Sequence, residues 1–338
     1  MKKTLSIIVP AYNSADYLER CVNSLIVGGE QLDIILVDDG STDATPKIVD
    51  EYAARFPNQI RAVHEKNAGH GGAINNGLRL AKAKYVKVCD SDDWLDFSGL
   101  KRLLDFIDQI NEKGESIDMI ITNYVYDKVG AKHKKRIHFS RLPKQRIFDW
   151  SDVRMLIGQY MMMHSITYRT NLLVKEAKIS LPTNVSYDDN IFVFEPLRYV
   201  HKMYYLDTDL YHYFIGRDDQ SVNENVMLKK IDQQLMINRR MIRFYATKID
   251  PKTDLGRYLR YYLEIITVIS SIILIRGRSQ HFIQLKKDLW QEIKDLDINL
   301  YHRLRMRPLG IGVNLPGSVG RKLSSGCYSL VHKVYGFN

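Results

Sequence analysis

The strongest constraint on the fold is a regular alternation of apolar, β-branched runs with helical patterns over the first hundred residues. The apolar runs occupy residues 5–9, 34–37, 60–63 and 85–89, with a further one at 117–122. Helical spacing of apolar residues falls between them, at about 18–26, 48–56 and 74–81. Because each run is apolar on both faces and a helix follows it, the sequence predicts βαβ units, a mainly parallel sheet and helices on both of its faces.

Composition narrows the class of protein. The chain has 338 residues, of which 45% are hydrophobic and 26% charged, which excludes an intrinsically disordered chain and allows one large domain or two modest ones. The net charge of +10 is uneven, because residues 1–100 sum to −3 and the remaining residues to +13. The three cysteines, Cys21, Cys89 and Cys327, lie far apart. They disfavour a disulfide framework and suit a reducing compartment.

Two apolar stretches bear on membrane insertion. The run before Pro10 is five residues long, too short for the core of a signal peptide. Residues 263–275 form the longest apolar stretch, and its thirteen residues are too few for an ordinary membrane span. We interpret it as a buried helix or a pair of strands, and we expect a cytoplasmic protein.

The second half of the chain is less regular. Residues 130–146 are strongly basic and predict a hairpin or a solvated loop, whereas the pattern from residue 226 onward is helical. Residues 308–320 contain four glycines and two prolines, which is typical of a turn-rich connector. We therefore predict one domain over 1–225 and a mainly helical region over 226–338.

Acidic residues follow three of the predicted strands. The five carboxylates belong to Asp38, Asp39, Asp90, Asp92 and Asp93. Ligands of an open parallel sheet bind beyond the carboxyl ends of its strands, so these groups meet at the binding edge. The negative charges of such a cluster repel one another unless a cation lies among the carboxylates. Carboxylate oxygens suit Mn²⁺ or Mg²⁺, and these metals usually also bind substrate phosphates, so we expect a nucleoside diphosphate as ligand. The alternative is that these acids only cap helices or form a solvated turn.

Two common phosphate-binding motifs are absent from the sequence. No G-x-G-x-x-G follows the first predicted strand, and Gly72–Gly77 is followed by Leu78-Arg79 instead of the Lys-Ser/Thr of a P-loop. The turn Asn67-Ala68-Gly69-His70-Gly71-Gly72 still allows close approach of the backbone to a ligand before a helix N-terminus. The alternative is a tight strand-to-helix turn with no ligand.

The ordered set of motifs resembles family 2 glycosyltransferases. The motifs are Ser-Ile-Ile-Val-Pro-Ala-Tyr-Asn (6–13), Val-Asp-Asp-Gly-Ser-Thr-Asp (37–43), Asn-Ala-Gly (67–69) and Asp-Ser-Asp-Asp (90–93). The resemblance is strong over residues 4–125 and thinner to about 220. It implies an α/β protein with the GT-A nucleotide-diphospho-sugar transferase fold, a Rossmann-like sheet flanked by helices, followed by a helical extension. Residues 1–125 would then be the nucleotide-sugar-binding half and 126–225 the acceptor-binding half.

The resemblance also implies roles for individual residues. Asp92 and Asp90 would hold the metal, with His212 as a third ligand or a diphosphate partner, and Asp189 would be the catalytic base supported by Asp188. The alternatives are that His212 is a structural histidine and that the acidic pair caps the following helix. The donor-binding set would be Pro10, Ala11, Tyr12, Asn13, Asp38, Asp39, Asn67, Gly69, His70, Asp90, Ser91 and Arg217. Many members have Arg-Asn where this chain has Ile74-Asn75. The donor diphosphate would then depend on His70 or on later basic residues.

The implied activity is a metal-dependent, inverting transfer of a sugar from a nucleotide-diphosphate donor, UDP-linked by preference, to a glycan or lipid-linked acceptor in cell-surface polysaccharide synthesis. One alternative is a sugar-phosphate nucleotidyltransferase, which would need a Gly-rich basic loop after the first strand, where Pro10–Asn13 stands. Another is a basic module that binds a polymer without catalysis. The basic segments lack interleaved aromatic residues, so we expect no nucleic-acid partner.

The excess positive charge of the second half fits an anionic ligand or an anionic inner membrane face. Residues 319–335 predict a basic amphipathic helix that lies in a membrane interface or packs on the core. Residues 226–300 could form a homodimer face or an acceptor-docking region.

Overall fold

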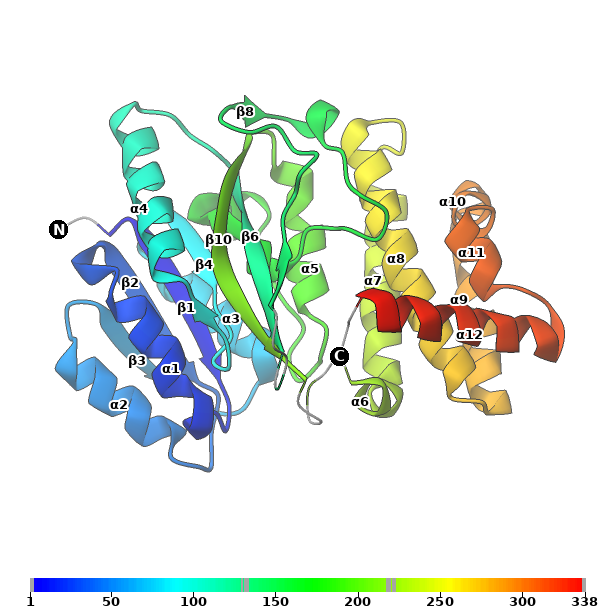
Figure 1. Ribbon diagram of the computed structural model, residues 1–338, viewed down its shortest axis with the longest axis horizontal. Coiled ribbons are helices and arrows are strands. Elements are labelled where there is room, and N and C mark those ends of the chain that lie inside the picture. Colours follow the sequence, from blue (N-terminus) through cyan, green and yellow to red (C-terminus); the bar gives the residue numbers. More distant parts are fainter. Residues whose placement is uncertain (1–2, 129, 131–133, 217–219, 221–222, 336–338) are drawn as a thin grey trace. The chain divides into compact units, whose positions relative to one another are not determined.

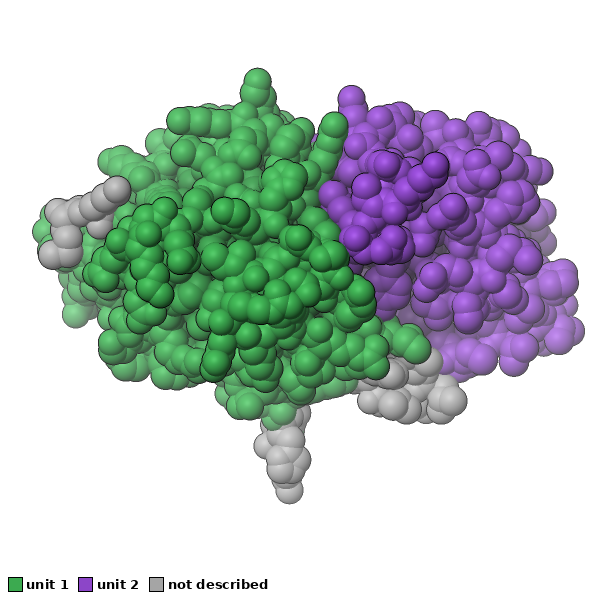
Figure 2. All heavy atoms as spheres, turned by 90° about the horizontal axis from the view of Figure 1, so that it is seen from above, with its two compact units in different colours: residues 1–215 green, residues 216–338 purple. Residues whose placement is uncertain are grey.

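The computed structural model describes the chain except residues 1–2, 129, 131–133, 217–219, 221–222 and 336–338. It divides into two compact units, residues 1–215 and 216–338, coloured separately in Figure 2. The division falls ten residues before the boundary expected from the sequence, because the last strand of the sheet ends at Ile215.

Unit 1 contains one mixed sheet and its covering helices (Figure 1). The strands are β1 (Leu5–Ala11), β2 (Leu32–Asp38), β3 (Ile60–His64), β4 (Tyr85–Val88), β5 (Trp94–Leu95), β6 (Met119–Lys128), β7 (Lys135–Ile137), β8 (Ile147–Phe148), β9 (Ile166–Arg169) and β10 (Met203–Ile215). The helices are α1 (Ala15–Ile26), α2 (Thr45–Arg55), α3 (Gly69–Leu80), α4 (Phe97–Glu112) and α5 (Asp189–Phe194). Each strand and each helix predicted in the first hundred residues is present, with shifted ends.

The strand order is β3-β2-β1-β4-β9-β6-β10-β5, with β7 paired to β6 and β8 to β10. Strands β1 to β4 are parallel, as predicted. The sheet is mainly parallel, as predicted, because β6 and β10 also run parallel to each other. The exception within its centre is β9, which lies between β4 and β6 and runs antiparallel to both. Four residues carry too little periodicity for a sequence pattern to identify β9.

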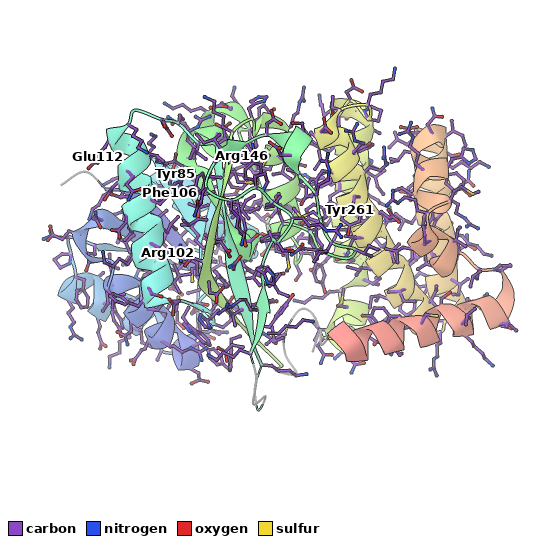
Figure 3. The ribbon with its side chains drawn as sticks, turned by 45° about the horizontal axis from the view of Figure 1, so that its top comes forward. Tyr85, Arg102, Phe106, Glu112, Arg146 and Tyr261 are labelled. Atoms are coloured by element: carbon purple, nitrogen blue, oxygen red, sulfur yellow. The ribbon has the colours of Figure 1, made fainter. Side chains whose placement is uncertain are left out.

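Helices cover the sheet and complete its core. Helix α3 packs on β1 and β2, and α4 packs on β10. Figure 3 labels Phe106 of α4, whose ring centroid lies 4.2 Å from that of Tyr204 on β10, and Tyr85 of β4. The buried hydroxyl of Tyr85 donates to the Ile117 carbonyl at 3.1 Å. These contacts hold the strand that precedes the acidic edge.

The basic segment 130–146 forms a hairpin arm, with β7 antiparallel to β6. Four of its described cations are paired with carboxylates of unit 1. The pairs are Lys134–Asp127 (2.5 Å), Arg136–Asp209 (2.5 Å), Lys144–Asp207 (2.6 Å) and Arg146–Asp152 (2.7 Å), with Arg146 labelled in Figure 3. The charge of these four residues is therefore balanced by carboxylates inside unit 1.

Unit 2 is helical, as predicted. Its helices are α6 (Glu224–Lys229), α7 (Ile231–Lys248), α8 (Asp254–Arg276), α9 (Gln280–Leu296), α10 (Ile298–Arg305), α11 (Pro308–Val313) and α12 (Gly317–Tyr335). The predicted connector at 308–320 is instead the short helix α11 and the start of α12. Pro308 begins α11, where a missing N–H costs nothing. Residues 319–335 lie in α12, the predicted helix.

Helix α8 contains the apolar stretch 263–275. By length and composition it is the one helix of the described chain that could cross a membrane, yet 78% of its apolar window is buried within the protein. Buried polar pairs join it to its neighbours: Gln234 Nε2 donates to Ser270 Oγ (3.1 Å), Asn238 Nδ2 to Thr267 Oγ1 (3.1 Å) and Trp290 Nε1 to Ser271 Oγ (3.0 Å). Helix α8 is therefore the core helix of unit 2, in agreement with the buried-helix interpretation.

Candidate active site

The acidic edge forms where β1, β2 and β4 end. Ala11 and Asp38 are register partners, and Asp39 N donates to the Ala11 carbonyl at 2.9 Å. Ser14 Oγ and Ser91 Oγ are 2.7 Å apart, which joins the end of β1 to the segment after β4. The structure thus brings together the three acidic and polar segments whose convergence the sequence predicts.

Several predicted donor-binding residues shape this edge by internal hydrogen bonds. Asp39 Oδ1 accepts from Ala68 N at 2.6 Å, and Asp38 contacts Ser41 N at 3.0 Å and His64 Nδ1 at 2.9 Å. Pro10, Ala11, Asp38, Asp39 and Ser91 are buried, whereas Tyr12, Asn13 and Asn67 are exposed. Thr42 N donates to Asn13 Oδ1 at 2.8 Å. The side chain of Tyr12 is 51% exposed.

Another segment of the chain packs closely against the glycine-rich turn. Gly69 has φ of +77°, and a Cβ there would lie 2.8 Å from Asn184 N. A Cβ at Gly71 would lie 2.4 Å from the Pro182 carbonyl oxygen. Asn184 N donates to the Ala68 carbonyl at 2.7 Å. The sequence predicts close approach of a ligand, but at these positions the close neighbour is the segment that leads into α5.

His70 connects the two acidic motifs. Its Nδ1 lies 3.0 Å from Asp188 Oδ2, and its Nε2 lies 3.1 Å from Asp90 Oδ1. Both ring nitrogens can donate to carboxylates only in the protonated form. Burial alone would lower the pKa of His70, but the charges of Asp188 and Asp90 and their hydrogen bonds outweigh it and raise the pKa well above its usual value. His70 is therefore an imidazolium that holds the motifs together.

The acidic pair at the start of α5 does not cap that helix. Asp188 occupies the N-cap position without a side-chain cap hydrogen bond, and its buried carboxylate contacts His70 instead. Asp189 Oδ1 accepts from Asn190 N at 2.9 Å. Burial of its carboxyl group and then the charge of Asp188 raise the pKa of Asp189 to about 7. A carboxyl that exchanges a proton near neutral pH has the property a general base needs.

Asp90 also belongs to a second cluster of polar side chains. Ligand atoms of Asp90, Asp93 and His164 all lie within 4.8 Å of one another. His164 is 4% exposed, its Nδ1 is buried without a hydrogen-bond partner, and burial lowers its pKa to about 4. Two carboxylates and a neutral imidazole form a donor set that accepts a divalent cation, so these residues fit the expected metal.

The remaining predicted ligands lie outside that cluster. His212 Nδ1 is 3.1 Å from Asp127 Oδ2, and its ring stacks on Trp94 with centroids 5.1 Å apart. The backbone carbonyl of Asp92 accepts from Arg20 Nη2 at 2.7 Å, and its side chain is partly exposed. Their roles as metal ligands stay predictions. Arg217, assigned to the donor diphosphate, lies outside the described residues.

Sequence reasoning missed the buried polar groups beneath the site. Lys87 is fully buried on β4, and its Nζ donates to the carbonyls of His164 (2.7 Å) and Ile166 (3.2 Å). Tyr211 Oη donates to Asp93 Oδ2 at 2.5 Å. A lysine inside an otherwise apolar strand is a pattern that could have identified Lys87. No sequence spacing links it to His164, because their contact is made across the sheet.

The His70 bridge predicts a pH-dependent effect on stability. The folded-state pKa of His70 lies above its unfolded value near 6.5, so its stabilisation is complete below that value and is lost as pH rises through the folded pKa. We expect His70→Gln to lower the unfolding free energy by about 1–3 kcal/mol at pH 6 and by less at alkaline pH. Urea unfolding in EDTA from pH 6 to 10 measures the difference; a constant difference would contradict the charged bridge.

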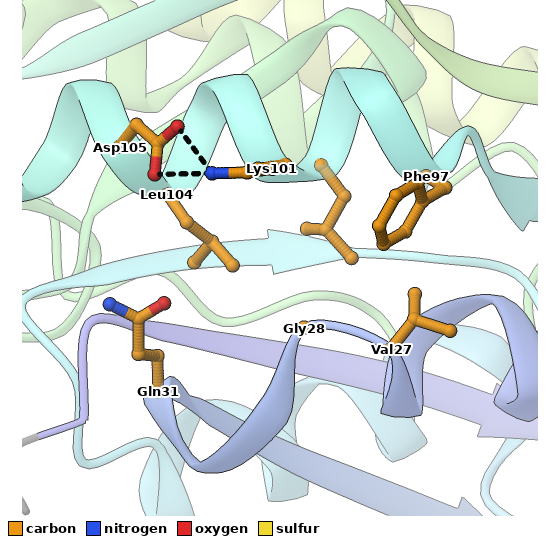
Figure 4. A pocket seen from close by; sticks show the side chains of 8 residues that line it. Val27, Gly28, Gln31, Phe97, Lys101, Leu104 and Asp105 are labelled. Atoms are coloured by element: carbon orange, nitrogen blue, oxygen red, sulfur yellow. Dashed lines mark hydrogen bonds and ion pairs between the residues drawn. The ribbon is translucent and has the colours of Figure 1, made fainter.

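A pocket elsewhere in unit 1 contains none of these residues. It lies between α4 and the segment after α1, lined by Val27, Gly28, Gln31, Phe97, Leu100, Lys101, Leu104 and Asp105 (Figure 4). Lys101 and Asp105 form an exposed ion pair of 3.1 Å on its rim. Its lining is mainly apolar, with Gln31 and this ion pair, so the acidic edge stays the candidate functional site.

Comparisons with known proteins show similarity to glycosyltransferases. Residues 6–168 match the family model described as Glycosyl transferase family 2. The chain is 26% identical over 230 residues to the putative glycosyltransferase EpsH of Bacillus subtilis, covering 62% of this chain and 60% of that protein. It is 28% identical over 237 residues to a poly(ribitol-phosphate) beta-glucosyltransferase of Bacillus spizizenii, covering 65% of this chain and 33% of that protein.

A solved structure supports the fold over both units. The crystal structure of S. aureus TarS 1–349 in complex with UDP-GlcNAc superposes with a TM-score of 0.68 and 19% identity, covering 97% of this chain and 92% of that one. At that identity the likeness shows the GT-A fold. The matched regions span less than two thirds of the two Bacillus relatives. With its motifs in order along residues 6–168 and its acidic edge assembled, the chain carries a glycosyl transferase family 2 region over those residues.

Proposed function

We propose that this protein transfers a sugar, with inversion, from a nucleotide-diphosphate donor to a hydroxyl group of a cell-surface glycan or lipid-linked acceptor. The observation that carries the proposal is the His70 bridge, which places the acidic motif after β4 next to the acidic pair of α5. One motif serves the donor and the other the acceptor, and a transferase needs both at one place. The named relatives, a glycosyltransferase and a poly(ribitol-phosphate) glucosyltransferase, support the class of reaction.

Each part of the site has a chemical task in this proposal. A divalent ion held by the Asp90–Asp93 segment would supply the Lewis acidity that neutralises the departing diphosphate. Asp189 takes the proton of the acceptor hydroxyl, and its pKa of about 7 keeps a large fraction ionised at neutral pH. Asp188 and His70 are positioning residues, because their paired charges fix the start of α5 against the end of β4.

The donor is proposed to be a UDP-sugar, and Mn²⁺ or Mg²⁺ the metal. The fold that this chain shares with TarS, solved with UDP-GlcNAc, supports a uridine nucleotide. The exposed Tyr12 ring and the buried Asp39 would meet the base. An acceptor at the membrane would place the enzyme on the cytoplasmic side, where nucleotide sugars are supplied.

A donor screen tests the proposal. The purified chain is mixed with UDP-, GDP- and dTDP-sugars and Mn²⁺, and nucleotide release and the shift in melting temperature are followed. We expect one nucleotide class to raise the melting temperature in the presence of Mn²⁺ and less so with EDTA, because a ligand that binds the folded state stabilises it. Absence of both a shift and nucleotide release with every donor would refute a nucleotide-sugar transferase.

A further inference from the structure

Lys87 is a polar residue inside the apolar centre of the sheet. Lysine is among the residues least often fully buried in proteins, yet the Lys87 side chain on β4 has no exposed surface. Its Nζ donates to the carbonyls of His164 and Ile166 and lies 5.2 Å from the centroid of the Tyr211 ring. Burial lowers the pKa of Lys87 to about 7, and its amino group has hydrogens for both bonds whether it is protonated or neutral. Because methionine would fill this space without burying an amino group, the two hydrogen bonds need an explanation beyond packing.

These hydrogen bonds extend the contact between β4 and β9 beyond their backbone pairing. The register pairs of the two antiparallel strands join residues 85–86 to residues 168–169. Lys87 is the next residue of β4, and its side chain reaches the carbonyl at the start of β9 and that of His164 just before it. Loss of the amino group would therefore remove two hydrogen bonds between β4 and the segment that carries His164.

Tyr211 connects Lys87 to the acidic segment after β4. Tyr211 Oη donates to Asp93 Oδ2 at 2.5 Å and accepts from Asp90 N at 3.1 Å. The His164 ring stacks on the Tyr211 ring, with centroids 4.8 Å apart and an angle of 26° between the planes. Lys87 is therefore bonded to His164 directly and is linked, through the Tyr211 ring, to the two acids of the same cluster.

We propose that Lys87 and Tyr211 are positioning residues that hold this cluster in the shape that binds a divalent cation. Lys87 fixes the backbone of His164, and Tyr211 fixes its ring, the Asp93 carboxylate and the Asp90 backbone. Removal of groups that orient metal ligands in this way commonly weakens metal binding by about 10- to 100-fold. Since this role rests on the proposed function, in which a divalent ion binds at the acidic edge, the wild type must be tested for Mn²⁺ binding beside the variants.

Titration of the melting temperature with Mn²⁺ measures the effect without turnover. The wild type, Lys87→Met and Tyr211→Phe are each titrated as the full chain with Mn²⁺, alone and in the presence of UDP. We expect Mn²⁺ to stabilise the wild type, and each variant to need at least about tenfold more Mn²⁺ for the same shift. Tyr211→Phe keeps the buried ring and loses only the hydroxyl group, so it tests the proposal even if Lys87→Met does not fold.

The direction of the change in Mn²⁺ affinity separates positioning from other roles of Lys87. A lysine that only supports the fold would lower the melting temperature without Mn²⁺ and leave the Mn²⁺ requirement unchanged. A lysine that acts only through its charge would repel the ion, so Lys87→Met would then bind Mn²⁺ more tightly. Either result would overturn the proposal.

A matched control and the wild type complete the experiment. Lys82→Met removes an exposed lysine just before the same strand and should titrate like the wild type. If Mn²⁺ does not stabilise the wild type with or without UDP, the metal of the proposed function and the roles of Lys87 and Tyr211 are refuted together. If the wild type responds and Lys87→Met and Tyr211→Phe respond at the same Mn²⁺ concentrations, only the positioning roles are refuted.

Discussion

Replacing Asp189 by asparagine should lower sugar transfer by about 10²–10⁴-fold, the range that a positioned general base contributes. The donor should still bind, because the substitution is isosteric and the proposed function assigns Asp189 to the acceptor side of the site. The asparagine retains an oxygen to accept the hydrogen bond from Asn190 N. Nucleotide-induced melting shifts and transfer rates, measured on the same preparations, separate the two effects.

The same residue predicts the pH profile of the wild type. Since burial and the charge of Asp188 raise the pKa of Asp189 to about 7, kcat/KM should rise with pH through that value, instead of near 4, as the base loses its proton. Asp105→Asn, an exposed carboxylate of α4, is the matched control and should change neither rate nor profile. An active Asp189→Asn enzyme, or an acidic limb near pH 4, would refute the assignment of the base.

The second large effect is expected at the acids after β4. Asp92→Asn should lower metal-dependent turnover by at least about 10²-fold. The reason is that loss of a carboxylate ligand weakens binding of the metal ion that would stabilise the leaving diphosphate. Mn²⁺ titrations of activity and of melting temperature measure how much more metal the variant requires.

Two further variants distinguish the alternative ligand sets. If the metal lies among Asp90, Asp93 and His164, then His164→Gln should raise the Mn²⁺ requirement and His212→Gln should not. If the set predicted from the sequence is correct, His212→Gln should have the effect and His164→Gln should not. An Asp92→Asn protein with normal Mn²⁺ dependence would exclude Asp92 from the metal site in either case.

Much of the site could be predicted from the sequence because its motifs follow strands directly. Asp38, Asp39 and Asp90 come at the ends of β2 and β4, and parallel strands bring their carboxyl ends to one edge. The boundary between domains and the helix α11 were harder to predict from the sequence, because short elements carry little periodicity. His212 illustrates another limit. Its position in the sequence does not predict that its ring contacts Asp127 on the neighbouring strand.

The sequence by itself determined the alternation of strands and helices, the parallel half of the sheet and the acidic edge, since these depend on local apolar patterns and on chain order. Only the tertiary structure decided what each polar group meets. His70 was predicted as a donor contact, and folding makes it the bridge between Asp90 and Asp188. Lys87 and His164 meet beneath the site because β4 and β9 are neighbours, a pairing between segments far apart in the chain. Pairings of that kind are set by packing of the whole sheet, which no local pattern records.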